Sequence, residues 1–197
     1  MNAKAFQVTL RQLYSQLRGE MEISIVDRAY AAQNLDRLAT ILVQSVEDGA
    51  VVGFVLPFSR EQSEAYWLSV FNAIAEQERL LFCATIDGQI VGMVQLYLSP
   101  EPNAPHRAEI FKLLVHRDFQ GRGVGTALML AVETEAVRLV RSLLILDTVL
   151  GGAGERLYRR LGWREIGVVP HHFVDPHGAA KASVYFMKFL DCGRDDA

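Results

Sequence analysis

Three glycines near the middle of the chain constrain the fold more than any other feature of the sequence. Gly121, Gly123 and Gly125 stand between an apolar segment and a segment whose apolar residues have helical spacing. Glycine allows a sharp backbone turn and leaves successive N–H groups accessible. Because these N–H groups would lie at a helix N-terminus, the pattern predicts a phosphate-binding loop that joins a strand to a helix.

The segments around this loop predict alternating strands and helices. We expect strands over residues 21–25, 79–86, 89–99, 107–115, 142–147, 163–169 and 183–189. We expect helices over residues 1–19, 35–46 and 155–161, one after Ser59 that carries Tyr66, Trp67 and Phe71 as core residues, and one after the glycine loop. Asp87-Gly88 between two apolar runs predicts a hairpin. Loops are expected over 49–58 and 170–182.

This order of elements predicts a single mixed α/β domain over residues 21–190. A helical extension is expected over 1–20 and a flexible tail over 191–197. Within the strand at 107–115, strict alternation would place Glu109, Phe111, Leu113 and Val115 on one face.

Composition excludes several classes of protein. Hydrophobic residues make up 50% of the 197 residues and charged residues 22%, which excludes a mainly disordered chain. The net charge of −3 does not suggest nucleic-acid binding, and no apolar run reaches the ~20 residues of a membrane span. Cys83, expected in the core, and Cys192 have no metal or redox spacing, so we expect a reduced, cytoplasmic setting.

Two other phosphate-binding motifs fit the glycine loop less well. No Gly-Lys-Ser/Thr follows it, so it is not a Walker loop. A dinucleotide-binding loop would need its third glycine where Thr126 stands. It would also follow the first strand of a βαβ series, whereas this loop lies in the middle of the chain.

Gln120-Gly121-Arg122-Gly123-Val124-Gly125 resembles the Q/R-x-x-G-x-G/A motif of the GCN5-related N-acetyltransferases, the GNAT family. The segment 112–115 resembles the fourth strand of that family, 143–148 the fifth, and Glu155-x-x-Tyr158-x-x-Leu161-Gly162-Trp163 the helix end that follows. The resemblance implies the GNAT fold: a mixed, mostly antiparallel central sheet, splayed between strands four and five and flanked by helices.

A closer resemblance is to the tabtoxin-resistance acetyltransferases, which acetylate an amine on a small β-lactam amino-acid toxin. It rests on the segments 48–54, 107–109, 146–148 and 176–178, with Tyr185-Phe186. The resemblance therefore implies direct transfer of an acetyl group from acetyl-CoA to the amine of a small molecule, such as an amino-acid-like compound, toxin or antibiotic. A protein or peptide N-acetyltransferase and a non-catalytic acetyl-CoA sensor stay as alternatives, and a homodimer stays open.

The resemblance also assigns the residues that would hold acetyl-CoA. The loop would bind its pyrophosphate, and the Val115 N–H would face the thioester carbonyl. The complete predicted cofactor-binding set is Leu113, Leu114, Val115, Gln120, Gly121, Arg122, Gly123, Val124, Gly125, Thr126 and Tyr158.

Three side chains are predicted to carry the proton transfers. The resemblance places Tyr158 near the sulfur of coenzyme A, and a phenol with a pKa near 10 is protonated at neutral pH and can act as the general acid. Asp147, at a strand end, and Glu109, on the facing strand, are candidates for the group that accepts a proton from the ammonium or binds it. The sequence does not rank the two carboxylates beyond a preference for Asp147.

His171, His172, Asp175 and His177 form a local cluster. Acetyl transfer to an amine needs no metal, and the spacing does not force three or four ligands to converge. We therefore expect a substrate-gating loop here and no metal site.

Overall fold

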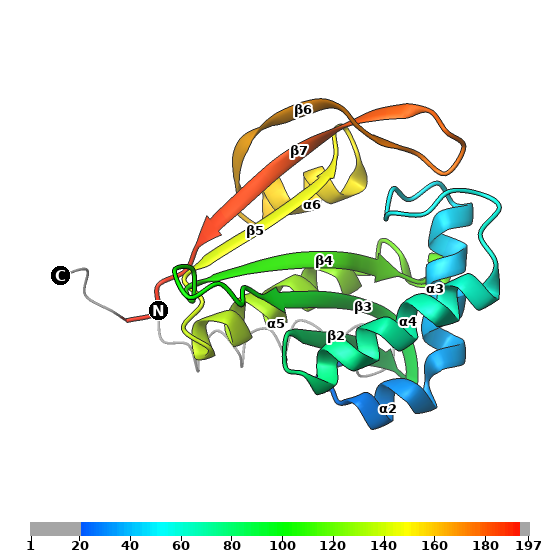
Figure 1. Cartoon of the computed structure of the whole chain (residues 1–197), viewed down its shortest axis with the longest axis horizontal. Helices are drawn as coiled ribbons and strands as arrows, with labels where there is room; N and C mark the ends of the chain where they lie inside the picture. The colour runs from blue at the N-terminus through cyan, green and yellow to red at the C-terminus, as the bar shows by residue number, and fades with distance from the viewer. Residues whose placement is uncertain (1–20, 194–197) are drawn as a thin grey trace.

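Seven strands form one sheet in the computed structural model, which describes residues 21–193. The strand order is β1-β2-β3-β4-β5-β7-β6, and all neighbours are antiparallel except β4 and β5, which are parallel (Figure 1). The strands are β1 (Met21–Val26), β2 (Arg79–Ile86), β3 (Gln89–Leu98), β4 (Arg107–Val115), β5 (Leu143–Val149), β6 (Arg164–Val174) and β7 (Ala180–Phe189). This is the expected mixed α/β fold with a mostly antiparallel sheet.

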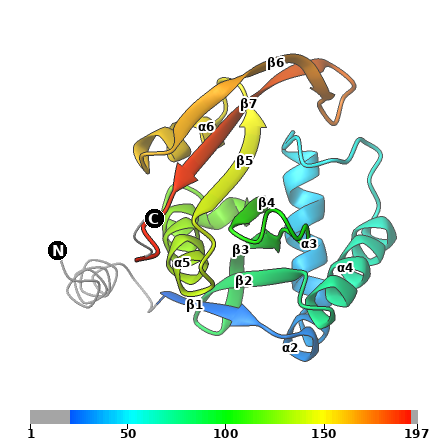
Figure 2. The ribbon, with the colours of Figure 1, turned by 60° about the vertical axis from the view of Figure 1, so that its left-hand side comes forward.

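Helices cover both faces of the sheet. They are α2 (Arg28–Gln33), α3 (Leu35–Glu47), α4 (Arg60–Ala75), α5 (Val124–Arg138) and α6 (Ala153–Arg160), with a 3₁₀ turn η1 (Arg117–Phe119). Figure 2 shows α3 and α4 on one side of the sheet and α5 with α6 on the other. Two buried clusters follow from this arrangement: Leu128 and Val132 of α5 belong to one, and Leu38 of α3 and Trp67 of α4 to the other.

Local sequence signals explain where several elements begin and end. The Ser59 side chain accepts a hydrogen bond from the backbone N–H of Gln62, and the Gln62 side chain accepts one from the Ser59 N–H, which is a complete capping box. The predicted hairpin turn is confirmed, because Asp87 and Gly88 both have positive φ, 52° and 74°. Helix α2 was not predicted, although Asp27 caps it: the Asp27 side chain accepts a hydrogen bond from the Tyr30 N–H at 2.8 Å.

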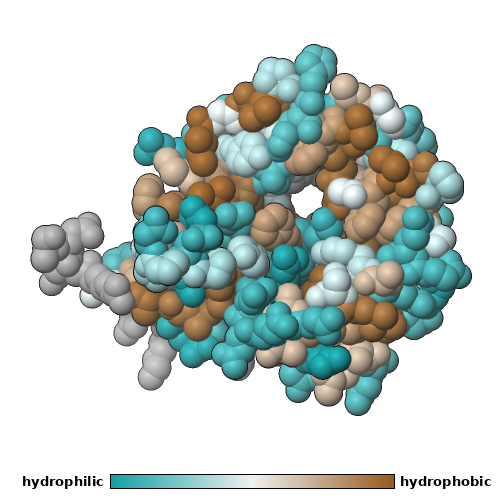
Figure 3. All heavy atoms as spheres, viewed as in Figure 1, coloured by the Kyte–Doolittle hydropathy of each residue, from teal (hydrophilic) through white to brown (hydrophobic). Residues whose placement is uncertain are grey.

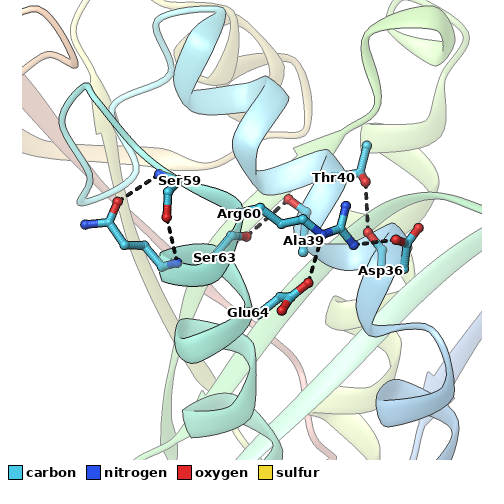
Figure 4. A network of polar contacts seen from close by, with 8 residues as sticks. Asp36, Ala39, Thr40, Ser59, Arg60, Ser63 and Glu64 are labelled. Atoms are coloured by element: carbon cyan, nitrogen blue, oxygen red, sulfur yellow. Dashed lines mark hydrogen bonds and ion pairs between the residues drawn. The ribbon is translucent and has the colours of Figure 1, made fainter.

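Polar contacts hold α3 against α4 (Figure 4). The buried Ser63 hydroxyl donates to the Ala39 carbonyl oxygen at 3.1 Å. Arg60 contacts Asp36 of α3 and also donates to Glu64 at 2.8 Å. These contacts join the N-terminal halves of the two helices, beside the point where the segment 48–59 enters α4.

The parallel strands β4 and β5 pair only at their beginnings. Arg107, Ala108 and Glu109 pair with Leu143, Leu144 and Ile145, and the pairing stops there. Beyond this point the strands diverge (Figure 1). The sheet is therefore splayed between its fourth and fifth strands, as the resemblance implied.

The expected alternation along β4 is wrong beyond Phe111. The register against β3 shifts between Met93 and Gln95, and Lys112 has a φ of 53°, so the strand carries a bulge there. The extra residue brings Leu113 and Val115 onto the α5 face, where they pack against the core. Glu109 and Phe111 remain on the opposite face.

The expected loop over 170–182 is also wrong. Strand β6 continues to Val174 and β7 begins at Ala180, so only 175–179 connect them. Pro170 lies inside β6 because β6 is an edge strand, where the missing N–H breaks no hydrogen bond to a second neighbour.

The predicted helix over 1–19 and residues 194–197 of the predicted tail lie outside the described residues. Within residues 21–193, no helix combines the length and the apolar character needed to cross a membrane.

Candidate active site

A cleft of about 800 Å³ occupies the region where β4 and β5 diverge. The glycine loop and α5 line one side of it, α6 and the end of β5 another, and the segment after α3 a third. The backbone N–H of Leu56 donates to the Pro176 carbonyl oxygen at 2.9 Å, so the 48–59 segment touches the β6–β7 hairpin. Figure 3 shows an opening that passes through the molecule in this region.

The glycine loop presents the N-terminus of α5 to the cleft. Gly121 and Gly123 have φ angles of 73° and 85°, a backbone conformation that residues other than glycine rarely adopt. Gly123 is the N-cap and provides no side-chain cap, and the first hydrogen bond to its carbonyl comes from the N–H of Ala127 at 3.0 Å. The N–H groups of the first turn are therefore available to an anionic group, and helix N-termini favour negative charge. These features fit the pyrophosphate of acetyl-CoA.

The predicted cofactor-binding residues lie together with one exception. All of them except Arg122 line the cleft. Arg122 is exposed, and its guanidinium lies 5.2 Å from the centre of the Phe119 ring. Gln120 contributes structurally as well, because its side-chain NH₂ donates to the Val115 carbonyl oxygen at 3.2 Å.

The sequence did not predict the other residues that line the cleft, because they come from segments far apart in the chain and share no motif. They are Ser45, Asp48, Gly49, Ala50, Val51, Val52, Phe119, Thr148, Val149, Gly152, Ala153, Gly154, Leu157, Arg160, Asp175 and Lys181.

Tyr158 lies on α6 at the edge of the cleft and is 6% exposed. Its ring packs 6.0 Å from that of Trp163 and 6.1 Å from that of Phe186, measured between ring centres. Burial, together with the negative charge of Asp147, raises the pKa of its hydroxyl well above the usual value. The phenol therefore keeps its proton throughout the neutral range and can donate it.

Asp147 lies on β5 opposite Tyr185 of β7. Its neighbours Leu144 and Leu146 are in the core on the α5 side, so Asp147 projects from the other face. Burial raises the pKa of its carboxyl group, and the Glu109 charge adds to this, while His172 and Lys112 act in the opposite direction. Within residues 21–193, Asp147 belongs to no ion pair.

Glu109 lies on the same face of the sheet as Asp147 but forms an ion pair with Arg107. Its carboxylate is 3.7 Å from the Nε of Arg107, and about a third of each side chain is exposed. Glu109 is close enough to Asp147 for its charge to contribute to the raised pKa of Asp147. Neither carboxylate lines the cofactor cleft.

Lys112 was not predicted as a site residue. The bulge in β4 turns its side chain under the 48–59 segment, where Nζ lies 5.5 Å from the ring centres of both Phe54 and Tyr66. Burial lowers its pKa to about 8, and Arg79 adds to the effect while Asp147 opposes it. A single lysine inside the apolar run 110–115 was the only signal in the sequence.

His172 also lies near Asp147, on β6 and not in the expected loop. Its Nδ1 is 2.6 Å from the hydroxyl of the buried Ser183, and its ring lies 5.6 Å from that of Tyr185. Across residues 21–193, no three His, Cys, Asp or Glu side chains are grouped to hold a metal ion.

The splayed sheet and the exposed N-terminus of α5 form a cleft that can bind an anionic cosubstrate. The model of the acetyltransferase (GNAT) family matches residues 56–163, more than half of the chain, so the protein belongs to this family.

Several proteins are similar to it in sequence. N-acetylaspartate synthetase of Xenopus tropicalis is 30% identical over 92 residues, which are 46% of this chain and 33% of that protein. The human N-acetylaspartate synthetase is 25% identical over 143 residues, 68% of this chain and 46% of that protein. An uncharacterised N-acetyltransferase of Azospirillum brasilense is 34% identical over 94 residues, 47% of this chain and 54% of that protein. The matches thus span between a third and about half of the relatives' lengths.

Solved structures share the fold at low sequence identity. An acetyltransferase of Acinetobacter baylyi superposes with a TM-score of 0.74 at 16% identity, covering 92% of this chain and 99% of that one. The protein yncA of Salmonella typhimurium, solved with its cofactor acetyl-CoA, has a TM-score of 0.71 at 19% identity and covers 90% of this chain and 96% of that one.

Proposed function

We propose that the protein transfers the acetyl group of acetyl-CoA directly to the amine of a small, amino-acid-like molecule. The observation that carries the proposal is the opening between β4 and β5, where a phosphate-binding helix N-terminus and Tyr158 line one side and Asp147 lies on the opposite face of the sheet (Figures 1 and 3). Two substrates that enter from opposite sides would meet there.

Bound acetyl-CoA supplies an activated acetyl thioester. The N–H groups at the start of α5 bind and orient the pyrophosphate, and the apolar Leu113, Leu114 and Val115 border the region beside it. In the proposed reaction the new bond joins the amine nitrogen to the acetyl carbon, and the carbon–sulfur bond breaks.

In this reaction two protons leave the nitrogen and one joins the sulfur. The acceptor amine arrives as an ammonium, and Asp147 accepts one proton or holds the ammonium until it loses that proton. Tyr158, which is protonated at neutral pH, gives its proton to the departing sulfur and takes one back from the nitrogen of the tetrahedral adduct, which must lose a second proton to become an amide. Asp147 is the stronger candidate of the two carboxylates because Glu109 is paired with Arg107.

The names of the sequence relatives support an amino-acid acceptor, since two of them are N-acetylaspartate synthetases. The resemblance to the tabtoxin-resistance branch points to the same chemical class. The alternatives are a protein or peptide acceptor and a non-catalytic acetyl-CoA sensor.

One assay separates these functions. Purified protein is mixed with acetyl-CoA and, separately, with free amino acids, amine antibiotics and short peptides with free N-termini. Free thiol and the mass of the acetylated product are measured. We expect thiol release with small amines; acetylation of peptides alone, or binding of acetyl-CoA without thiol release for any amine, would contradict the proposal. Tyr158→Phe serves as the control for thiol release that does not depend on the site.

A further inference from the structure

Two half-buried cations, Arg79 and Lys112, lie on the face of the sheet that carries Asp147, which we call the acceptor side, and neither has a counterion in the described part of the chain. Within the described residues 21–193, neither Arg79 nor Lys112 belongs to an ion pair. The Nε of Arg79 is buried without a hydrogen-bond partner, and Lys112 Nζ lies between aromatic rings. Buried charges in folded proteins are usually paired, because removing them from water is costly.

A chain of contacts connects the two cations. Arg79 Nη1 donates to the Gln95 side-chain oxygen at 2.6 Å, and the Gln95 NH₂ donates to the Tyr66 hydroxyl at 2.9 Å. The Tyr66 ring in turn borders Lys112 Nζ at 5.5 Å. The guanidinium of Arg79 lies 5.5 Å from the ring centres of Tyr97 and Phe111, so its orientation is fixed by packing.

This cationic group lies on the same face of the sheet as Asp147. Gln95 pairs with Phe111, and Glu109 with Tyr97, so the side chains of β3 and β4 on this face are neighbours beneath α4. Asp147 and Lys112 influence each other's titration, and the Arg79 charge contributes to the lowered pKa of Lys112. The acceptor side therefore carries a positive part, Arg79 and Lys112, and a negative part, Asp147, with aromatic rings that limit access of water.

From these features we infer that Lys112 and Arg79 bind a free carboxylate of the acceptor while Asp147 faces its amine. The inference rests on the proposed function and deepens it: the acceptor is an amino acid, with an ammonium and a carboxylate in one small molecule. The N-terminus of a peptide does not meet this requirement, because an uncharged amide stands where the free amino acid has its α-carboxylate. Exclusion of water by Phe54 and Tyr66 strengthens the attraction between the carboxylate and the cations.

The test compares acceptors that differ only in the carboxylate. Each free amino acid is assayed beside its C-terminal amide and its decarboxylated amine, with acetyl-CoA saturating. The wild-type protein should prefer the acid at least about tenfold in kcat/KM, which is the size expected for losing one hydrogen bond to a charged group. Equal or better activity with the amides would overturn the inference while the proposed acetyl transfer stands.

Variants test whether the two cations cause the preference. Lys112→Met keeps the length of the side chain and removes its charge, so the ratio of acid to amide should fall toward one. Lys112→Arg restores the charge and should restore part of the preference. Arg138→Met is the matched control, because Arg138 is 69% exposed on α5 and its loss changes the net charge equally. An undiminished preference in Lys112→Met would overturn the role of Lys112.

A binding measurement separates failure of this inference from failure of the proposed function. The same acid and amide pairs are titrated calorimetrically into the protein with coenzyme A present. If no amine is acetylated, the proposed function fails, yet tighter binding of the acids than of the amides still supports the carboxylate site. Equal or absent binding of both members of every pair overturns it.

Discussion

The unpaired charge of Lys112 should reduce the stability of the protein at neutral pH. Its pKa is lowered from 10.5 to about 8, chiefly by burial. Each pKa unit corresponds to ~1.4 kcal/mol, so the folded state loses roughly 3 kcal/mol relative to a lysine that stays in water. Lys112→Met removes this charge and keeps the side chain's length, and we expect it to raise the free energy of unfolding by about that amount at pH 7.

The pH dependence gives the sharper test. Below pH 8 Lys112 is protonated in both the folded and the unfolded state, and the full penalty applies. Between pH 8 and 10.5 the unfolded state binds more protons than the folded state, so the stability contributed at this position rises with pH. The stability advantage of Lys112→Met should therefore be largest below pH 8 and shrink as the pH approaches 10.5.

Urea unfolding of both proteins at pH 7, 8, 9 and 10 measures this difference. Other groups that titrate in this range are present in both proteins, so their effects cancel in the difference. Lys188→Met is the paired-lysine control: Lys188 Nζ is 2.8 Å from Glu133, so its removal should destabilise the protein. A difference between wild type and Lys112→Met that stays constant from pH 7 to 10 would refute the reasoning.

Three further predictions concern the reaction itself. Gly123→Asp places a charged side chain at a φ of 85° beside the phosphate site, and calorimetry should show loss of acetyl-CoA binding with an unchanged circular dichroism spectrum. Tyr158→Phe should lower kcat by ~10²–10⁴-fold with little change in the KM for acetyl-CoA, as expected for loss of a general acid, and a wild-type kcat with chemistry rate-limiting would exclude this role. Asp147→Asn should lower kcat, and the loss should shrink at higher pH as the free amine deprotonates; a higher KM for the amine with kcat intact would instead assign Asp147 to ammonium binding. Glu109→Gln should have the smaller effect on kcat, because Glu109 already pairs with Arg107.

Local sequence signals were sufficient for most of the fold. The Ser59 cap, the Asp87-Gly88 turn and the glycine loop each act within a few residues, so their physical causes are visible in the sequence. The family resemblance added the splayed sheet and the predicted cofactor-binding residues, and all of these residues except Arg122 line the cleft.

The acceptor side could not be predicted in the same way. A single inserted residue in β4 reverses the alternation and turns Lys112 toward Phe54 and Tyr66, and nothing in the run of apolar residues indicates where that insertion falls. Arg79 and Gln95 lie on the neighbouring strands β2 and β3, and the register between these strands brings their side chains into contact. Such sites arise from tertiary packing, which a motif search does not detect.

The hydrogen bond from the Leu56 N–H to the Pro176 carbonyl oxygen limits which molecules can reach the proposed reaction centre. It joins the 48–59 segment to the β6–β7 hairpin, so the chain encircles the opening seen in Figure 3. An open trough would accept a polypeptide laid across it sideways, whereas a ring admits only what can be threaded, such as a small molecule, a chain end or a protruding side chain. We therefore expect that an internal main-chain segment of a folded protein does not pass through the opening while this link is closed.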